Sequence, residues 1–289
     1  MRDDVLKQEI EREDNPVISE TEFLQALERA GVYLPIPTET STVPPESHIV
    51  VYSDPRSGGA DRFRLVQLRL KGLQASKNLK SLLITSPLPG EGKTTVALNL
   101  ATALAEKGKR PVLLLEADVY RPTVVKRLGL TPWLGLTECF EGNRDPLLAI
   151  RRIDPLGFYL LPGGYPMEDG SSLLQSDFTS RLMKDLAATP FSWVLIDSPP
   201  ATPIAEILAL RAQSDATLLV SRARKTPREA IEETTRSLGR DHILGIILND
   251  VEGLNRVYSQ YYGYTNPEAR VKPEKAEGML GLGLKTHGE

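Results

Sequence analysis

Cysteine is almost absent from this sequence of 289 residues. The single Cys139 excludes an intramolecular disulfide and a thiolate metal cluster, and it fits a reducing compartment. The three histidines, His48, His242 and His287, lie too far apart along the chain to suggest a histidine metal site. The net charge of −3 is too small to indicate general attraction to nucleic acid, so we expect no nucleic-acid partner.

Long apolar runs are also missing. No stretch approaches the roughly 20 apolar residues that cross a bilayer. The first residues, MRDDVLKQEIERED, lack the apolar core of a secretory signal. We therefore expect a cytoplasmic protein without a transmembrane segment of its own, whose membrane association would come from a partner.

Residues 1–47 differ in composition from the rest and are expected to form an extension. Ser19 and Glu22 make a capping-box pattern at the start of a short amphipathic helix within residues 18–31. Its apolar stripe could pack on the main domain or dock another protein, and the sequence leaves both open. PIPTETSTVPPES at 35–47 is typical of a Pro/Ser/Thr-rich linker, and HIVVYS at 48–53 predicts a strand or an extended arm.

From residue 48 to 250, short apolar runs alternate with helical patterns. Continuous apolar runs are typical of strands buried on both faces. Their alternation with helices predicts an α/β domain with a mostly parallel sheet covered by helices on both faces. The predicted strands lie at residues 81–86, 111–118, 157–164, 191–200, 215–221 and 243–250.

A glycine loop, SPLPGEGKTT at 86–95, joins the first of these strands to a helix. Gly90 and Gly92 let the backbone approach a phosphate at a helix N-terminus, where unpaired N–H groups favour an anion. Lys93 is expected to reach the β- and γ-phosphates of ATP, and Thr94 to bind Mg²⁺. Pro87 replaces the first glycine of the usual P-loop pattern, but the strand before the loop and the helix after it support this interpretation.

Acidic residues follow two further apolar strands. LLLEAD ends in Glu116 and Asp118, and VLIDSPP contains Asp197. Open α/β sheets bind ligands at the carboxyl ends of their strands, and phosphoryl transfer needs carboxylates that hold the metal. Each of these acids could instead cap the following helix.

The last predicted strand ends at Asn249, whose amide could contact a nucleobase or stabilise a turn. The predicted nucleotide-binding residues are Pro89, Gly90, Glu91, Gly92, Lys93, Thr94, Thr95 and Asn249. The predicted metal ligands are Thr94, Asp118 and Asp197, and the predicted catalytic residues are Lys93, Glu116, Asp118 and Asp197.

Tyrosines gather near the end of the sequence. Four of the nine tyrosines, Tyr258, Tyr261, Tyr262 and Tyr264, lie close together among polar residues. We expect an exposed, mobile tail over residues 251–289, although a structural aromatic cluster stays open. An exposed tyrosine run beside a nucleotide site suggests phosphate acceptors, because each phosphate adds nearly two negative charges.

Together these motifs resemble the bacterial tyrosine kinases, the separate cytoplasmic kinases of capsule and exopolysaccharide systems. The resemblance covers roughly residues 49–265, with SPLPGEGKTT as Walker A, LLLEADVYRP as Walker A′, VLIDSPP as Walker B, and the tyrosine cluster. It implies MgATP-dependent autophosphorylation of the tail in trans within ring-like homo-oligomers. It also implies activation by a membrane-anchored polysaccharide chain-length regulator, which would recruit the protein to the inner face of the membrane.

Three positions depart from the family pattern. Walker A′ usually reads Asp-x-Asp-x-Arg, whereas this sequence has Glu116 at the first position and Tyr120 at the last. Arg121 directly follows Tyr120 and could substitute for the missing arginine. The assembly motif Glu-x-x-Arg-x-x-Arg corresponds to Asp61-Arg62-Phe63-Arg64-Leu65-Val66-Gln67, so Gln67 lacks the last charge. Two alternatives therefore stay open: an ATP-binding scaffold or regulatory ATPase with little kinase activity, and an ATPase that positions cellular cargo.

Overall fold

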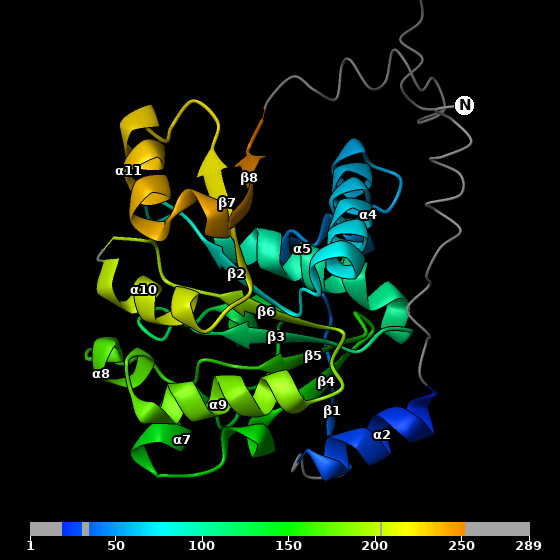
Figure 1. Ribbon diagram of the computed structural model, residues 1–289. Helices are drawn as coiled ribbons and strands as arrows, with labels where there is room; N and C mark the ends of the chain where they lie inside the picture. Colours follow the sequence, from blue (N-terminus) through cyan, green and yellow to red (C-terminus); the bar gives the residue numbers. More distant parts are fainter. Residues whose placement is uncertain (1–18, 31–34, 203, 252–289) are drawn as a thin grey trace, which may run out of the picture. The chain divides into compact units, whose positions relative to one another are not determined.

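Eight strands form one sheet in the computed structural model, which describes residues 19–30, 35–202 and 204–251 (Figure 1). The order across the sheet is β1-β4-β5-β3-β6-β2-β7-β8. The strands are β1 (Thr38–Thr40), β2 (Ser81–Thr85), β3 (Val112–Glu116), β4 (Arg151–Asp154), β5 (Phe158–Leu161), β6 (Trp193–Asp197), β7 (Ala216–Arg222) and β8 (Ile243–Asn249).

Neighbouring strands in the sheet are parallel except for the antiparallel pair β4 and β5. The predicted mostly parallel sheet is therefore confirmed. The strands β1 and β4 were not predicted, because TET and RRID are short and polar and give no apolar run.

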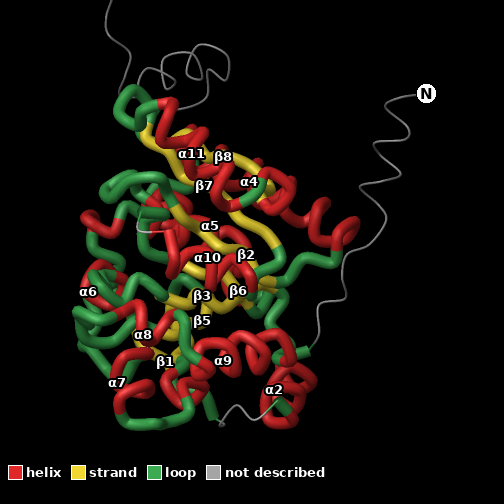
Figure 2. Tube along the Cα trace, turned by 60° about the vertical axis from the view of Figure 1, so that its left-hand side comes forward, coloured by secondary structure: helices red, strands yellow, loops and turns green. Residues whose placement is uncertain are grey.

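Helices cover both faces of the sheet, as Figures 1 and 2 show. The described α-helices are α2 (Glu20–Arg29), α3 (Val50–Ser53), α4 (Gly58–Lys77), α5 (Lys93–Ala105), α6 (Val124–Arg127), α7 (Leu136–Glu141), α8 (Gly170–Leu174), α9 (Asp177–Ala188), α10 (Ile204–Ala212) and α11 (Arg228–Leu238). Short 3₁₀ helices lie at η1 (Pro45–Ser47), η2 (Glu106–Gly108), η3 (Pro146–Ala149) and η4 (Arg240–His242).

Two apolar cores lie on opposite faces of the sheet. Along β3, Val112 and Leu114 pack into the core that contains α4, α5 and α6. Leu113 and Leu115 belong to the core that contains α2 and α7 to α11. Side chains of a strand alternate between its faces, so a strand covered on both sides must be apolar throughout, as the sequence of β3 is.

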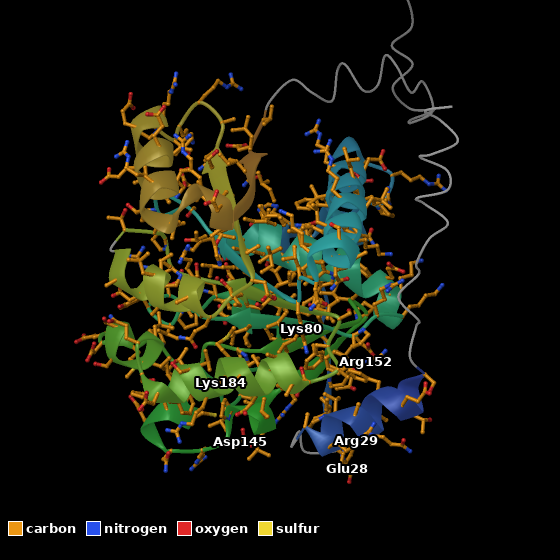
Figure 3. All side chains as sticks on the ribbon, in the orientation of Figure 1. Glu28, Arg29, Lys80, Asp145, Arg152 and Lys184 are labelled. Carbon is orange, nitrogen blue, oxygen red and sulfur yellow. The ribbon has the colours of Figure 1, made fainter. Side chains whose placement is uncertain are left out.

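The N-terminal helix α2 packs on the main domain in cis. Ser19 and Glu22 form the predicted capping box. The ring of Phe23 lies 5.5 Å from that of Tyr159 and 5.7 Å from that of Phe191. Figure 3 shows Glu28 and Arg29, both exposed, on the side of α2 away from the sheet.

The segment after this helix differs from its prediction. Residues 35–47 were expected to be a linker, yet β1 pairs with β4 and Val43 is buried. Residues 48–53 were expected to be extended, but α3 occupies Val50–Ser53. In both places tertiary contacts override the local sequence signal. The domain boundaries proposed at residues 48 and 250 stay predictions.

Nowhere in the part of the chain that the structure describes does a helix have both the length and the apolar character needed to cross a bilayer.

We expect Leu27→Ala to lower the free energy of unfolding by about 2–5 kcal/mol, because the side chain of Leu27, on α2, is completely buried in the core. Chemical denaturation followed by circular dichroism measures the change. Glu28→Ala, on the exposed face of the same helix, serves as the control and should change stability little. Equal stabilities of Leu27→Ala and the wild type would show that α2 does not contribute to the core.

Candidate functional site

A cavity of about 820 Å³ opens at the carboxyl ends of five parallel strands, β2, β3, β6, β7 and β8. This is the edge at which open α/β sheets bind ligands. The lining residues are His48, Pro89, Gly90, Glu91, Gly92, Lys93, Thr94, Thr95, Asp118, Tyr120, Arg121, Thr123, Arg127, Pro199, Pro200, Thr202, Glu206, Arg222, Asn249 and Asp250. All eight predicted nucleotide-binding residues are among them.

The glycine loop between β2 and α5 is shaped for close approach of a ligand. Gly92 has a φ of +90°, and a Cβ added there would lie 2.1 Å from Nδ2 of Asn249, so no larger residue fits. No side chain among the described residues caps α5, whose first N–H groups therefore remain available to an anion. The loop thus has the geometry of a phosphate cradle.

Two side chains hold this loop in place. Nδ2 of Asn249 donates a hydrogen bond to the carbonyl oxygen of Glu91 at 2.9 Å. The buried Glu91 carboxylate accepts the N–H of Leu88 at 3.1 Å and the hydroxyl hydrogen of Thr226. Asn249 therefore supports the loop from β8, and contact with a nucleobase stays a prediction.

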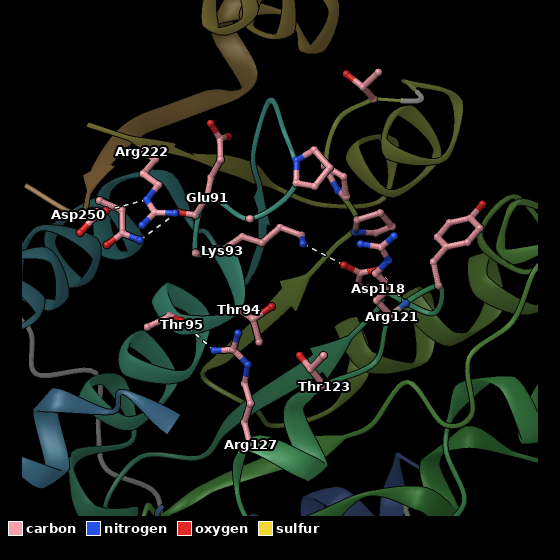
Figure 4. A pocket seen from close by; sticks show the side chains of 18 of the residues that line it. Glu91, Lys93, Thr94, Thr95, Asp118, Arg121, Thr123, Arg127, Arg222 and Asp250 are labelled. Atoms are coloured by element: carbon pink, nitrogen blue, oxygen red, sulfur yellow. Dashed lines mark hydrogen bonds and ion pairs between the residues drawn. The ribbon is translucent and has the colours of Figure 1, made fainter. Parts of the chain in front are cut away.

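Lys93 and Asp118 meet inside the cavity. Nζ of Lys93 lies 2.9 Å from Oδ2 of Asp118 (Figure 4), and both residues are buried. A nearly buried ammonium group beside a phosphate cradle strongly favours a bound anion, since burial weakens solvent screening.

Asp197 lies at the end of β6, directly opposite Glu116 on β3, and only 1% of it is exposed. Burial raises its pKa to about 7, while the charge of Lys93 and the hydroxyl of Thr94 act in the opposite direction. Within the described ranges neither carboxylate oxygen has a hydrogen bond of normal geometry, and Asp197 is not among the cavity-lining residues. Asp197 is therefore a buried carboxylate that does not line the cavity and that has no well-formed hydrogen bond within the described residues.

The oxygen atoms of Thr94, Asp118 and Asp197 are of the kind that Mg²⁺ prefers. Asp197 sits close enough to Lys93 and Thr94 for both to affect its pKa, so the three predicted ligands share one region. The unpaired oxygens of Asp197 fit a cation as their missing partner. These residues are therefore compatible with a magnesium nucleotide.

The carboxylate of Glu116 faces backbone N–H groups rather than the large cavity. Its Oε1 accepts N–H groups of Thr123 at 2.5 Å and Val124 at 2.8 Å, and its Oε2 accepts that of Gly163 at 3.1 Å. Burial raises its pKa, against the effect of these N–H donors. Glu116 does not line the large cavity but a separate one of about 180 Å³. It anchors the start of α6, and a catalytic role stays a prediction.

Tyr120 is also part of the cavity wall. Its hydroxyl donates to Oε1 of Glu206 at 2.9 Å. Burial, together with this hydrogen bond to a carboxylate, raises the pKa of Tyr120 to about 12. Tyr120 therefore remains neutral, and the cavity carries the charge of Arg121 beside it rather than a basic group at position 120.

Sequence reasoning missed several polar residues of the cavity. Arg222 ends β7 and pairs with Asp250 at 2.7 Å, and the rule that ligands bind at strand ends could have found it. Arg127 lies on α6 and donates to Oγ1 of Thr95 at 2.9 Å, and Glu206 lies on α10. Neither belongs to a motif, so only the fold brings them to the site.

The predicted phosphate acceptors Tyr258, Tyr261, Tyr262 and Tyr264 lie outside the described residues. Their role stays a prediction.

A glycine loop that leads from a buried strand into a helix headed by lysine defines a P-loop nucleotide-binding protein. Residues 82–271 match the family model described as the CobQ/CobB/MinD/ParA nucleotide binding domain. The chain belongs to this family.

Comparison with known proteins gives a closer relationship within this family. The tyrosine-protein kinase YwqD of Bacillus subtilis (strain 168) is 28% identical over 220 residues, which cover 75% of this chain and 92% of that relative. The succinoglycan biosynthesis transport protein ExoP of Rhizobium meliloti (strain 1021) is 29% identical over 74% of this chain, but the match spans only 28% of ExoP. The resemblance to bacterial tyrosine kinases is confirmed.

A solved structure supports the same relationship. The crystal structure of the VpsO kinase domain superposes with a TM-score of 0.58 at 28% sequence identity. The superposition covers 66% of this chain and 95% of the VpsO domain. The predicted P-loop fold is thus confirmed by sequence and by structure.

We predict that the stability of the protein free of nucleotide and magnesium falls as the pH rises from about 4 to about 7. The pKa of Asp197 is raised from 3.8 to about 7, so in this window the folded state holds a proton that the unfolded state releases. Asp197→Asn should remove this contribution, which is on the order of a few kcal/mol. Urea unfolding of both proteins across the window measures the difference, and parallel pH profiles would contradict the assignment.

Proposed function

We propose that this protein is an ATP-dependent protein-tyrosine autokinase that regulates polysaccharide polymerisation or export. The observation that carries the proposal is the Lys93–Asp118 pair at the phosphate cradle, in a chain that matches 92% of the length of the tyrosine-protein kinase YwqD. ExoP, a protein named for succinoglycan biosynthesis and transport, supports the polysaccharide context.

In the proposed reaction, the hydroxyl oxygen of a tail tyrosine forms a bond to the γ-phosphorus of ATP. The bond from that phosphorus to the β,γ-bridging oxygen breaks, and ADP leaves with the electron pair. The phenolic proton passes to a carboxylate of the site or to solvent. This chain contributes the phosphate cradle and the charge of Lys93, which stabilise the phosphates, and a cavity that orients them.

Thr94, Asp118 and Asp197 would hold Mg²⁺, which would neutralise charge on the phosphates. The proposed phosphate acceptors are Tyr258, Tyr261, Tyr262 and Tyr264, within a tail over residues 251–289. We propose that transfer occurs in trans, from one copy of the chain to the tail of another, as the resemblance to bacterial tyrosine kinases implies.

We also propose assembly into a ring-like homo-oligomer and activation by a membrane-anchored chain-length regulator at the inner face of the membrane. On α4, Leu65 and Leu68 are 47% and 64% exposed, which favours a contact with another chain. Polar residues of the assembly motif are engaged within the chain, since Arg64 pairs with Asp61 and the neutral Gln67 donates to Glu106 at 3.2 Å. Assembly would have to redirect these side chains.

An ATP-binding scaffold with little kinase activity is a second candidate. It is favoured by the position of Glu116, whose carboxylate is bound to three backbone N–H groups outside the large cavity. It is also favoured by the neutral Tyr120 in the cavity wall.

We expect Lys93→Ala to abolish tyrosine phosphorylation of the purified protein, because the mutation removes the positive charge at the phosphate cradle. Incubation with MgATP, antibody detection of phosphotyrosine and mass mapping of the tail provide the measurement. Lys184→Ala, an exposed lysine on α9 (Figure 3), is the matched control and should retain the signal. Persistence of phosphotyrosine in pure Lys93→Ala protein would refute the assignment.

The double change Glu116→Asp and Tyr120→Arg separates the two candidates. If the native protein is an active kinase, the double variant should show no gain in phosphate transfer, because it loses the anchor of α6 and the Tyr120–Glu206 hydrogen bond. A gain of about tenfold or more in the rate would instead support the scaffold, since such a gain corresponds to well over 1 kcal/mol of transition-state stabilisation.

A further inference from the structure

Arg127 is a cavity residue that no sequence motif includes. It is the last residue of the short helix α6, and its Nη1 donates to Oγ1 of Thr95 at 2.9 Å. Thr95 lies two residues after Lys93 in the first turn of α5, which is the phosphate-facing turn. Figure 4 shows the side chain of Arg127 reaching Thr95, while the side chain of Lys93 points toward Asp118.

The charge of Arg127 is not compensated by an acid. Over the described ranges of the chain, Arg127 forms no ion pair and its side chain makes only the hydrogen bond to neutral Thr95. Two other cations at the cavity are paired, since Lys93 pairs with Asp118 and Arg222 pairs with Asp250, whereas Arg121, like Arg127, forms no ion pair within the described residues. A guanidinium group is always charged and carries five N–H donors, so most of its donors remain available to a ligand.

The helix that carries Arg127 is held firmly. Glu116 accepts the N–H groups of Thr123 and Val124 at its start. Val124 and Leu128 are completely buried in the core beside α5. Thr123 and Arg127, four residues apart, share the opposite face and both line the cavity. The arginine is therefore presented to the cavity by a fixed element.

We propose that Arg127 is a further nucleotide-binding residue, whose guanidinium group binds the phosphate chain of the nucleotide. Arginine suits phosphate because its planar fork donates two parallel hydrogen bonds. Glu116 then acts as a positioning residue, because it holds the helix that presents Arg127. This inference rests on the nucleotide binding in the proposed function but does not require kinase activity.

The test is the dissociation constant of ADP, measured by calorimetry on the full chain for the wild type and three variants of Arg127. Arg127→Ala should weaken ADP binding about tenfold to a hundredfold, as expected for loss of a charge-assisted hydrogen bond. Arg127→Gln retains an N–H donor for Thr95 but lacks the charge, so it should be as weak as Arg127→Ala. Arg127→Lys keeps the charge without the fork and should be intermediate.

Arg181→Ala changes an exposed arginine on α9 that is not among the lining residues; this variant is the matched control and should bind ADP as the wild type does. The loss in Arg127→Ala should shrink as salt is raised, because salt screens the attraction. Wild-type affinity in Arg127→Gln would mean that Arg127 only bridges α6 to Thr95, and this would overturn the proposal. Wild-type affinity in Arg127→Ala would do the same.

This experiment separates the inference from the proposed function. ADP binding that depends on Arg127, without any tyrosine phosphate after incubation with MgATP, would support the inference and refute the kinase. Tyrosine phosphorylation with no effect of the Arg127 variants on ADP affinity would support the kinase and refute the inference. Failure of the wild type to bind ADP would overturn both.

Discussion

The site depends on the convergence of strand ends that the parallel sheet imposes. Because β2, β3 and β6 run side by side in the same direction, their carboxyl ends bring the glycine loop, Asp118 and Asp197 into one region. The Lys93–Asp118 pair forms there from residues 25 positions apart in the sequence. Two apolar cores hold the strands in this register. The buried leucines of the sheet therefore help to position the charged residues of the site.

Much of the fold and part of the site follow from the sequence. The six apolar strands, the P-loop and the acids at strand ends are each visible as a local sequence pattern. The structure brings them together as expected. The strands β1 and β4 and the cis packing of α2 depend on tertiary contacts, such as those of Phe23 with Tyr159 and Phe191. No local pattern in a polar segment such as TETS predicts pairing with a strand more than 100 residues away.

The positions that depart from the kinase pattern are linked by the structure. Glu116 reaches the N–H groups that begin α6, and α6 places Arg127 against Thr95. Tyr120 supplies no charge and instead donates to Glu206. A sequence comparison records these as separate substitutions, whereas the contacts connect Glu116 through α6 to Arg127, a basic residue of the cavity that the motif does not include. Side-chain direction decides this, and sequence spacing does not report it.

The central claim is that one copy of the protein transfers phosphate to the tail of another. The most direct measurement mixes two variants: Lys93→Ala with an intact tail, and a chain with an intact P-loop whose four clustered tyrosines are replaced by phenylalanine. After incubation with MgATP, the account predicts phosphotyrosine on the Lys93→Ala chains, identified by mass mapping. No phosphotyrosine on those chains, under conditions in which the wild type phosphorylates itself, would contradict transfer between copies.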